Sequence, residues 1–287
     1  QQQQQQQQQQ QGLGSSAAAW EGAYGSGAAA AWSAGTAPQA GVGVAAGGRL
    51  QGLGASNGFG TSSPSGMPAY PRDKLFSLDV ECVAVGNTHL MSDRYPCLLA
   101  LVDSNAKVIL RVTIKPDRPV VSYLTPLTGM RAEDMENGVS LAEATELLRR
   151  HLPPDAVLVG QKPDGDIEWM RLRKGIDFAD VVDLAEVLKG FNQKYGQFNY
   201  HSLQHQAAIL LDKHSSGAHD PAWDAQVSME LYHKAVEATA EELENMRQSL
   251  LQKRPAPSVA KQYNYVMDDV CLAKFMPKNC ICGRPCG

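Results

Sequence analysis

The chain has 287 residues, of which 43% are hydrophobic, so it is long enough for one domain with a sizeable core and flanking tails. It contains no run of about 18 apolar residues, which argues against a membrane-spanning helix. Its formal net charge of −4 argues against a broad basic surface for nucleic acid but permits a metal-dependent site.

The N-terminal part of the sequence has low complexity. Glutamines without an initiating methionine precede a stretch of Gly, Ala and Ser, so we expect a piece of a longer product. Only Glu21 and Arg49 carry charge in residues 1–70. Such a segment buries too little apolar surface to offset its ordering entropy. We therefore expect residues 1–70 to be a disordered tail and order to begin near Lys74.

Three strand-like segments come first after the tail. They cover residues 75–85, 96–102 and 108–114, and a short polar link at 103–107 joins the last two as a hairpin. Short links between consecutive strands predict an antiparallel start to a sheet.

Strands and helices alternate after residue 140. Ser140 with Glu143 three residues on predicts a capped helix over 140–151, and the apolar run 156–160 is typical of a buried parallel strand. The remaining expected elements are a helix over 164–173, a strand over 179–183, and helices over 183–189, 202–211 and 221–252. This order predicts an α/β layer fold with one mixed sheet.

The first strand carries two carboxylates on one face. Asp79 and Glu81 are two residues apart, and residues i and i+2 of a strand project from the same side. Two like charges on a buried strand are unfavourable unless a cation lies between them. A divalent metal explains the pair, and an edge strand whose polar face meets water is the alternative.

Three downstream residues fall where such a sheet gathers ligands. Asp166 follows the strand 156–160, and ligands bind outside the carboxyl ends of strands in α/β sheets. Pro221 marks a helix start, which puts Asp224 one turn into that helix and His219 in the preceding loop. Taken singly, each residue has a simpler interpretation. Asp166 would be an acid at a helix N-terminus, Asp224 a residue on a solvated helix face, and His219 a histidine in a surface loop.

Taken together, the four acids suit a metal site. Carboxylates without a His or Cys cage favour Mg²⁺ or Mn²⁺. Four of them can hold two ions about 3.5–4 Å apart, the arrangement that clamps the attacking and leaving oxygens of a phosphodiester. His219 would then be a general base for water.

These motifs resemble the DEDDh family of 3′→5′ exonucleases, which has a ribonuclease H-like fold. The resemblance covers about residues 74–236 and rests on the Asp-x-Glu strand, the downstream acid and the His-x4-Asp ending. Within that family the chain is most similar to the Rex-type RNA exonucleases. The segments that carry this likeness are Ile114-Lys115-Pro116, Val121-Ser122-Tyr123-Leu124-Thr125-Pro126-Leu127-Thr128-Gly129-Met130, Leu158-Val159-Gly160, His219-Asp220-Pro221-Ala222-Trp223-Asp224-Ala225 and Met229-Glu230-Leu231-Tyr232.

The resemblance implies an enzyme and assigns its residues. It implies a mixed five-stranded sheet flanked by helices, and a two-metal 3′→5′ exonuclease that releases nucleoside 5′-monophosphates. Its metal ligands would be Asp79, Glu81, Asp166 and Asp224, and His219 would activate the attacking water. Thr128, Gly129 and Met130 match the family segment that packs against the terminal base or sugar. Single-stranded nucleic acid is the implied partner, with RNA preferred over DNA.

Two departures from the family pattern matter. Gln161 stands where the family often has His, which leaves Asp164 and Asp166 as candidates for the third ligand. The offset of Asp166 from Gly160 agrees with the Rex-type spacing, so Asp166 is preferred. Asp220 stands where a tyrosine subtype would have Tyr, which favours the histidine subtype.

The C-terminus is rich in cysteine. Cys280-Ile281-Cys282-Gly283 resembles the opening of a GRF-type zinc finger, and Cys286 follows. Zinc needs four ligands. Three interpretations stay open: a truncated module, a site that Cys271 completes with the other three cysteines, and plain thiols. With no secretory signal in view, free thiols or a metal in a reducing, intracellular compartment are expected.

The sequence suggests four regions and leaves two rival functions. The regions are a tail (1–70), an exonuclease domain (74–236), a helical extension and linker (237–270) and a Cys-rich end (271–287). The rivals are a DNA exonuclease of the same fold and a catalytically silent nucleic-acid-binding or scaffold protein. The histidines at 201, 205, 214 and 233 are expected at the surface.

Overall fold

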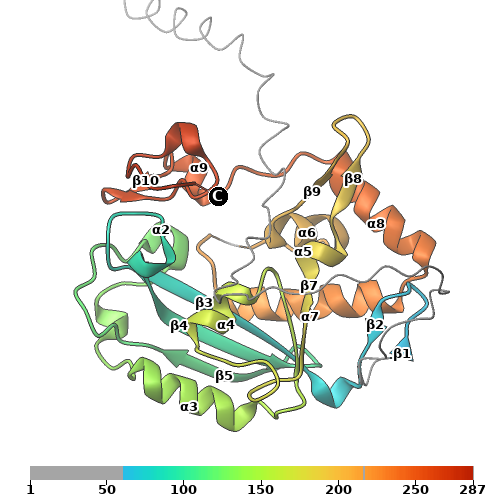
Figure 1. Ribbon diagram of the computed structural model, residues 1–287, viewed down its shortest axis with the longest axis horizontal. Coiled ribbons are helices and arrows are strands. Elements are labelled where there is room, and N and C mark those ends of the chain that lie inside the picture. Colours follow the sequence, from blue (N-terminus) through green and yellow to red (C-terminus); the bar gives the residue numbers. More distant parts are fainter. Residues whose placement is uncertain (1–60, 216, 287) are drawn as a thin grey trace, which may run out of the picture.

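The computed structural model describes residues 61–215 and 217–286, and its centre is a five-stranded sheet (Figure 1). The strand order is β5-β4-β3-β6-β7, in which β3, β4 and β5 are antiparallel and β6 and β7 run parallel to β3. The strands are β3 (Leu75–Ala84), β4 (Arg94–Asp103), β5 (Val108–Thr113), β6 (Val157–Gly160) and β7 (Asp180–Asp183). The predicted mixed five-stranded sheet is confirmed.

Helices and short strand pairs surround this sheet. The helices are α2 (Thr125–Thr128), α3 (Leu141–His151), α4 (Asp164–Trp169), α5 (Leu184–Val187), α6 (Leu203–Leu210), α7 (Pro221–Glu237), α8 (Ala240–Gln252) and α9 (Val259–Gln262). The short strand pairs are β1 (Thr61–Ser62) with β2 (Pro68–Ala69), β8 (Gly190–Asn192) with β9 (Gln197–Asn199), and β10 (Val266–Met267) with β11 (Val270–Cys271). The 3-10 turns are η1 (Arg72–Lys74), η2 (Met91–Asp93), η3 (Glu133–Met135) and η4 (Pro277–Asn279).

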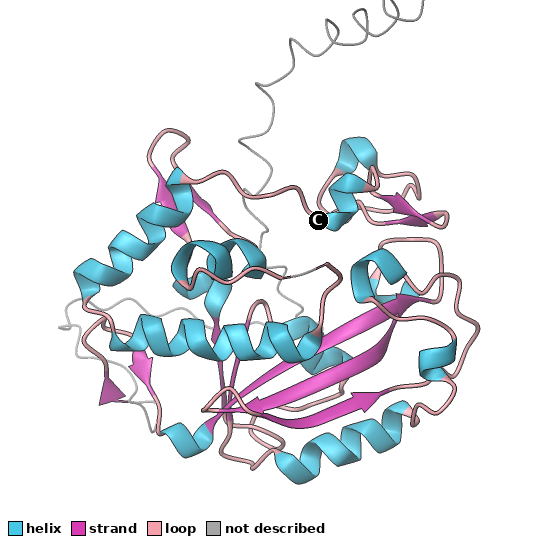
Figure 2. Cartoon of the chain, turned by 180° about the vertical axis from the view of Figure 1, so that it is seen from behind, coloured by secondary structure: helices cyan, strands magenta, loops and turns pink. Residues whose placement is uncertain are grey.

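The apolar core lies on both faces of the sheet. One cluster joins Leu78 and Val80 of β3 to Leu141 and Leu148 of α3. The other joins Leu75 of β3 to the buried residues of α7, which crosses the sheet in Figure 2. Side chains of β3 therefore alternate between the two cores, because successive residues of a strand point to opposite faces.

The short length of β6 leaves part of β3 open. β6 pairs only with Leu75, Phe76 and Ser77, so the remainder of β3 extends past the carboxyl end of β6. The turn of chain after β6 leads into α4, which packs beside β3. The end of a parallel strand, where its neighbour continues, is the place at which open α/β sheets collect functional side chains.

Two of the sequence expectations about element boundaries were wrong. The region expected to be one helix over 221–252 is two helices, α7 and α8, separated at Ala238 and Thr239. Within residues 61–70, expected in the disordered tail, two residues contact the domain: Met67 is buried, and the Tyr70 amide N–H donates to the Tyr232 hydroxyl at 3.3 Å. The rest of the expected tail, residues 1–60, lies outside the described residues.

The expected helix over 164–173 is also shorter than predicted. α4 ends at Trp169, and Arg171 has a positive φ of 52°. Within residues 61–215 and 217–286, no helix has the length and apolar character needed to span a membrane.

Candidate active site

Asp79 and Glu81 lie on the face of β3 that packs against α7. They share this face with Leu75, which belongs to the α7-side core. Their neighbours across the strand pair are Ala100 and Leu98 of β4. The register shifts between Glu81 and Cys82, a bulge that breaks the regular alternation directly after the two carboxylates.

Asp166 reaches the same place from α4. Because β6 ends before this point, the Val80 backbone amide of β3 is free to hydrogen-bond the Asp166 carboxylate. Asp164, the alternative candidate, is exposed, whereas Asp166 is half-buried. The structure therefore brings Asp166, and not Asp164, up against β3.

Asp224 and His219 come from the start of α7. Asp220 caps this helix, since its carboxylate accepts the Ala222 N–H at 3.1 Å, and Pro221 occupies the first turn. The cap puts Asp224 one turn in, where its side chain is only 5% exposed. The Nδ1 atom of His219 lies 3.2 Å from Asp224 Oδ2 and 3.9 Å from Glu81 Oε1.

The carboxylates of this group interact strongly. Burial first, and then the charges of Asp166, Asp224 and Glu81, raise the pKa of Asp79 well above its ordinary value. Burial first, and then the charges of Glu81 and Asp224, also raise the pKa of Asp166 well above its ordinary value. Several negative charges thus lie in one buried region with too little positive charge to balance them.

The charges of Glu81 and His219 partly compensate each other. Burial raises the pKa of Glu81 to about 7, although the nearby His219 opposes this shift. For His219, burial by itself lowers the pKa, but the Asp224 hydrogen bond and the Glu81 charge outweigh it and raise the value. The histidine side chain is 30% exposed, so its ring can exchange a proton with water.

This donor set fits a hard divalent cation. Asp224 Oδ1 is buried and has no hydrogen-bond partner within the described part of the chain. An unpartnered buried carboxylate oxygen is costly unless a ligand satisfies it. Oxygen ligands of this kind suit Mg²⁺ or Mn²⁺.

The segment expected to contact substrate is a compact loop beside His219. Thr128 ends α2, and its buried hydroxyl donates to the Tyr123 carbonyl at 2.9 Å and accepts the Met130 N–H at 3.1 Å. Gly129 has a φ of 71° and faces Ala218, leaving room for close approach of the two loops. The His219 N–H donates to the Leu127 carbonyl at 2.8 Å, so this loop fixes the histidine backbone.

Two polar residues near these side chains, Gln204 and Arg111, were not predicted from the sequence. The Gln204 amide nitrogen lies 3.3 Å from His219 Nδ1 and 3.4 Å from Nε2. Arg111 of β5 pairs with Asp220 at 2.6 Å, next to the start of α7. Neither residue belongs to a spacing pattern, so only the fold brings them near His219.

A second cluster of metal-binding residue types lies at the C-terminal end. It comprises His89, Cys271, Cys280 and Cys282, and their ligand atoms all lie within 4.8 Å of one another. Cys286, which the sequence grouped with Cys280 and Cys282, lies beside Cys280 but is not one of these four residues: its thiol donates to the Ala273 carbonyl at 3.4 Å. The other partner of this cluster, His89, carried no signal in the sequence.

The sheet and its helices define a ribonuclease H-like fold of the kind found in exonuclease domains. The catalytic unit of Neurospora crassa Pan2, which holds a protease and a nuclease domain, matches 64% of this chain and 30% of its own with a TM-score of 0.52 and 19% identity. A module of Saccharomyces cerevisiae Pan2 solved with AAUUAA RNA matches 64% of this chain and 33% of its own with a TM-score of 0.50 and 18% identity. The predicted fold class is confirmed.

The sequence is similar to RNA exonucleases over more than half of its length. It is 32% identical over 171 residues to small RNA degrading nuclease 3 of Arabidopsis thaliana, covering 58% of this chain and 21% of the relative. It is 31% identical to RNA exonuclease 4 of Candida glabrata over 56% of this chain and 60% of the relative. The chain thus spans between about a fifth and three fifths of these relatives. No protein-family model matches it.

Proposed function

We propose that this chain is a divalent-metal-dependent 3′→5′ exonuclease that removes nucleoside 5′-monophosphates from single-stranded RNA. The observation that carries the proposal is the meeting of acids from three separate elements, β3, α4 and α7, beside one histidine. Relatives named as RNA exonucleases and small RNA degrading nucleases support RNA as the substrate.

The acids would act as metal ligands. Asp79, Glu81, Asp166 and Asp224 would hold two Mg²⁺ or Mn²⁺ ions, which supply the positive charge that stabilises a phosphodiester under attack. We assign the third ligand to Asp166 because its carboxylate interacts with those of Glu81 and Asp224, whereas Asp164 is exposed.

His219 would be the general base. With Nδ1–H donated to Asp224 at 3.2 Å, Nε2 is the nitrogen left to accept a proton from the attacking water. The negative charges of Asp224 and Glu81 favour the protonated ring that results. Gln204, within hydrogen-bond distance of the ring, would restrict its orientation.

The loop from Thr128 to Met130 would receive the 3′-terminal nucleotide. The Thr128 side chain is fully used within the loop, so its proposed contact with substrate is through the backbone and through Gly129, which carries no side chain. The same loop holds the His219 amide, so nucleotide position and general base would be linked. Residues 74–236 would form this catalytic domain.

The test uses two acids of one helix. Single-stranded RNA labelled at its 5′ end should shorten stepwise from the 3′ end in Mn²⁺ or Mg²⁺, and a chelator should stop the reaction. The cleavage rate of Asp166→Asn should fall to that of the wild type in chelator. Asp164→Asn, two residues away on α4, should keep the wild-type rate. His219→Ala should reduce the rate by about 10²–10⁴-fold.

Other outcomes would change the assignment. Wild-type activity in Asp166→Asn, or loss of activity in Asp164→Asn alone, contradicts the ligand set. Faster degradation of a DNA strand of the same sequence would reassign the substrate, since recognition of the 2′-hydroxyl separates RNA from DNA. If no metal condition gives cleavage, the chain would instead be a catalytically silent nucleic-acid-binding or scaffold protein with a nuclease-like fold.

A further inference from the structure

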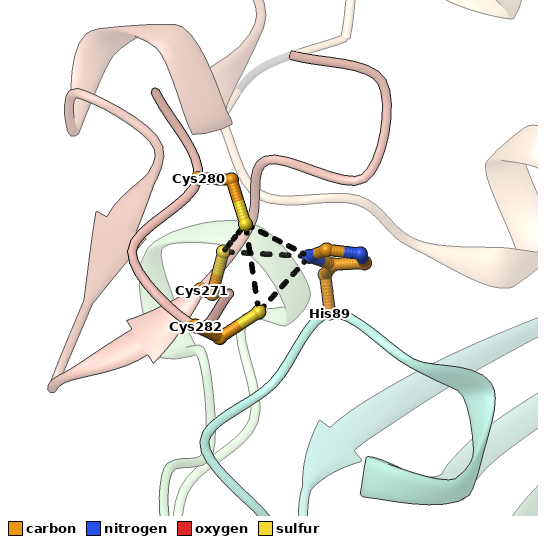
Figure 3. A group of neighbouring side chains, drawn as sticks. All are labelled: His89, Cys271, Cys280 and Cys282. Atoms are coloured by element: carbon orange, nitrogen blue, oxygen red, sulfur yellow. Dashed lines mark hydrogen bonds between the residues drawn. The ribbon is translucent and has the colours of Figure 1, made fainter. Parts of the chain in front are cut away.

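Four metal-binding side chains meet where the C-terminal segment, defined here as residues 259–286, touches the sheet domain. Cys271, Cys280 and Cys282 come from that segment, and His89 comes from the loop between β3 and η2 (Figure 3). Residues nearly two hundred positions apart in the chain thus direct their ligand atoms at one point, which separates this cluster from an ordinary group of thiols.

Five of the six distances between the ligand atoms match the edges of a zinc tetrahedron, and the sixth, between the sulfurs of Cys271 and Cys282, is within 4.8 Å. Zinc–ligand bonds of ordinary length put two sulfurs about 3.8 Å apart, and a sulfur and a nitrogen about 3.6 Å apart. The sulfur–sulfur distances are 3.9 Å for Cys271 and Cys280 and 3.6 Å for Cys280 and Cys282. The distances from His89 Nδ1 are 3.5, 3.8 and 3.3 Å to the sulfurs of Cys271, Cys280 and Cys282. A disulfide would need its two sulfurs about 2 Å apart.

The histidine ring is oriented as a ligand. Its Nδ1 atom faces the three sulfurs, and its Nε2 atom lies 3.0 Å from the Pro285 carbonyl oxygen. A carbonyl only accepts, so Nε2 carries the proton and the lone pair of Nδ1 points at the cysteines. A second hydrogen bond that fixes the tautomer in this way is the usual support of a metal-bound histidine.

The surrounding backbone supports the sulfurs. The N–H groups of Gly283 and Arg284 hydrogen-bond the Cys280 and Cys282 sulfurs, and Gly283 adopts a φ of 66° that lets the chain turn beneath them. The Arg94 guanidinium of β4 donates to the Cys271 carbonyl at 2.9 Å, which brings a positive charge near the thiolates.

The described part of the segment has only small apolar cores. Tyr265, Cys271 and Ala273 form one, with Cys280 and Cys282 packed against it, and Met267 and Val270 form another with Ala84 and Leu124 of the sheet domain. The β10–β11 hairpin consists of two residues per strand. A unit of this size buries too little apolar surface to be stable alone and usually needs a metal or a crosslink.

We propose that His89, Cys271, Cys280 and Cys282 bind one structural zinc ion, which fastens the C-terminal segment to the loop after β3. Soft thiolates with one imidazole select zinc over Mg²⁺ or Mn²⁺. Four protein ligands leave no position open for water, so the ion has a structural role and no catalytic one. The fourth ligand comes from the sheet domain and not from a later part of a zinc finger.

Such an ion would also stabilise the proposed active site, a consequence that rests on the proposed function. His89 follows β3, the strand of Asp79 and Glu81. Met267 and Val270 of the segment pack on Leu124, and Asp268 accepts a 2.6 Å hydrogen bond from Ser122. Leu124 is the N-cap residue of α2, and the Leu127 carbonyl of α2 accepts the His219 N–H. Zinc would therefore also help to hold α2 and the loop from Thr128 to Met130 in place.

The first test measures metal content and needs no activity. The purified chain should contain one zinc per molecule by elemental analysis and release it when a mercurial reagent blocks the thiols. The metal-free chain should bind one Co²⁺ with the visible bands of a tetrahedral thiolate complex. Absence of zinc, iron in its place, or a disulfide mass with no metal would overturn the proposal.

Matched variants test the ligand set. Cys282→Ser and His89→Ala should each weaken zinc binding by about tenfold or more in competition with a chelator. Cys286→Ser changes a neighbour of Cys280 that is not in the ligand set, and should weaken zinc binding much less than Cys282→Ser. Equal losses for Cys286→Ser and Cys282→Ser, or wild-type affinity in His89→Ala, would contradict the assignment.

Hydrogen exchange tests the attachment to the sheet domain. The Cys271 N–H donates to the Asn87 carbonyl at 2.9 Å, across the contact that zinc would hold. Removal of zinc from the wild type should speed exchange in residues 265–282 and leave α3 unchanged. Unchanged exchange in that segment would mean that the ion does not fasten it.

Discussion

At the scale of single residues, His201 occupies surroundings that disfavour its charged form. Its Nε2 atom is buried without a hydrogen-bond partner among the described residues, and its ring centre lies 5.3 Å from that of His205. Burial first, and then the neighbouring His205, lower the pKa of His201 from 6.5 to about 4. Above pH 6.5 His201 is neutral in both the folded and the unfolded state, so its protonation does not change the stability of the fold there.

Acidification should therefore destabilise the fold through His201. As the pH falls from 6.5 towards 4, the unfolded chain binds the proton and the folded chain does not. Between pH 7 and pH 5 the wild type should lose about 1 kcal/mol more stability than His201→Phe, allowing for partial exposure. Urea unfolding at the two pH values measures this difference. His214→Gln, whose histidine is 72% exposed, is the control, and a wild-type pH slope in His201→Phe would contradict the argument.

His205 corrects another residue-scale expectation. The sequence placed it at the surface, but it is only 6% exposed, and its Nε2 atom lies 3.0 Å from the Leu250 carbonyl of α8. The partner that makes burial of this imidazole tolerable is 45 residues further along the chain. Local patterns cannot reveal such a partner.

At the scale of elements, the break between α7 and α8 has a clear local cause. The Thr239 hydroxyl accepts the Glu242 N–H at 3.2 Å, and the Glu242 carboxylate accepts the Thr239 N–H at 2.8 Å. This capping box begins a new helix, which buries Leu243 and Leu250 beside α6 and β8. The spacing of Thr239 and Glu242 is visible in the sequence, but the prediction of one long helix over 221–252 did not use it.

Loss of that cap should destabilise the protein measurably. Thr239→Ala removes the N-cap side chain and should lower the free energy of unfolding by about 1 kcal/mol. The urea midpoint should fall while the slope of the transition stays unchanged. Asn245→Ala, at an exposed position of α8, is the control and should have a much smaller effect. Equal effects of the two substitutions would show that the cap does not stabilise the helix.

At the scale of the whole molecule, the acidic group links three elements of the domain. Asp79, Asp166 and Asp224 belong to β3, α4 and α7, and without a cation their charges repel one another across the sheet edge. A cation that binds only the folded chain stabilises it by mass action. The stability of the fold should therefore depend on whether the proposed metal ion is bound at this position.

Thermal unfolding tests this dependence. Saturating Mn²⁺ should raise the melting temperature of the wild type, where 1 kcal/mol corresponds to about 2–4 °C for a chain of this size. Asp79→Asn should be more stable than the wild type in chelator, because one buried charge is removed, and should gain little from Mn²⁺. A metal-free Asp79→Asn protein less stable than the wild type would contradict the repulsion argument.

The sequence by itself determined the parts of this protein that depend on short-range periodicity and spacing. The alternation along β3 was enough to put Asp79 and Glu81 on one face, and Pro221 was enough to put Asp224 one turn into α7. The order of strands and helices predicted the mixed sheet, because connection length restricts how strands can pair.

Only the tertiary structure decided which distant side chains meet. The choice between Asp164 and Asp166 depends on where β6 stops beside β3, and the approach of Gln204 to His219 depends on how α6 packs. His89 is isolated in the sequence and gains three cysteine neighbours only when the C-terminal segment folds back on the loop after β3. Such contacts arise from packing between segments far apart in the chain, and no local periodicity encodes them.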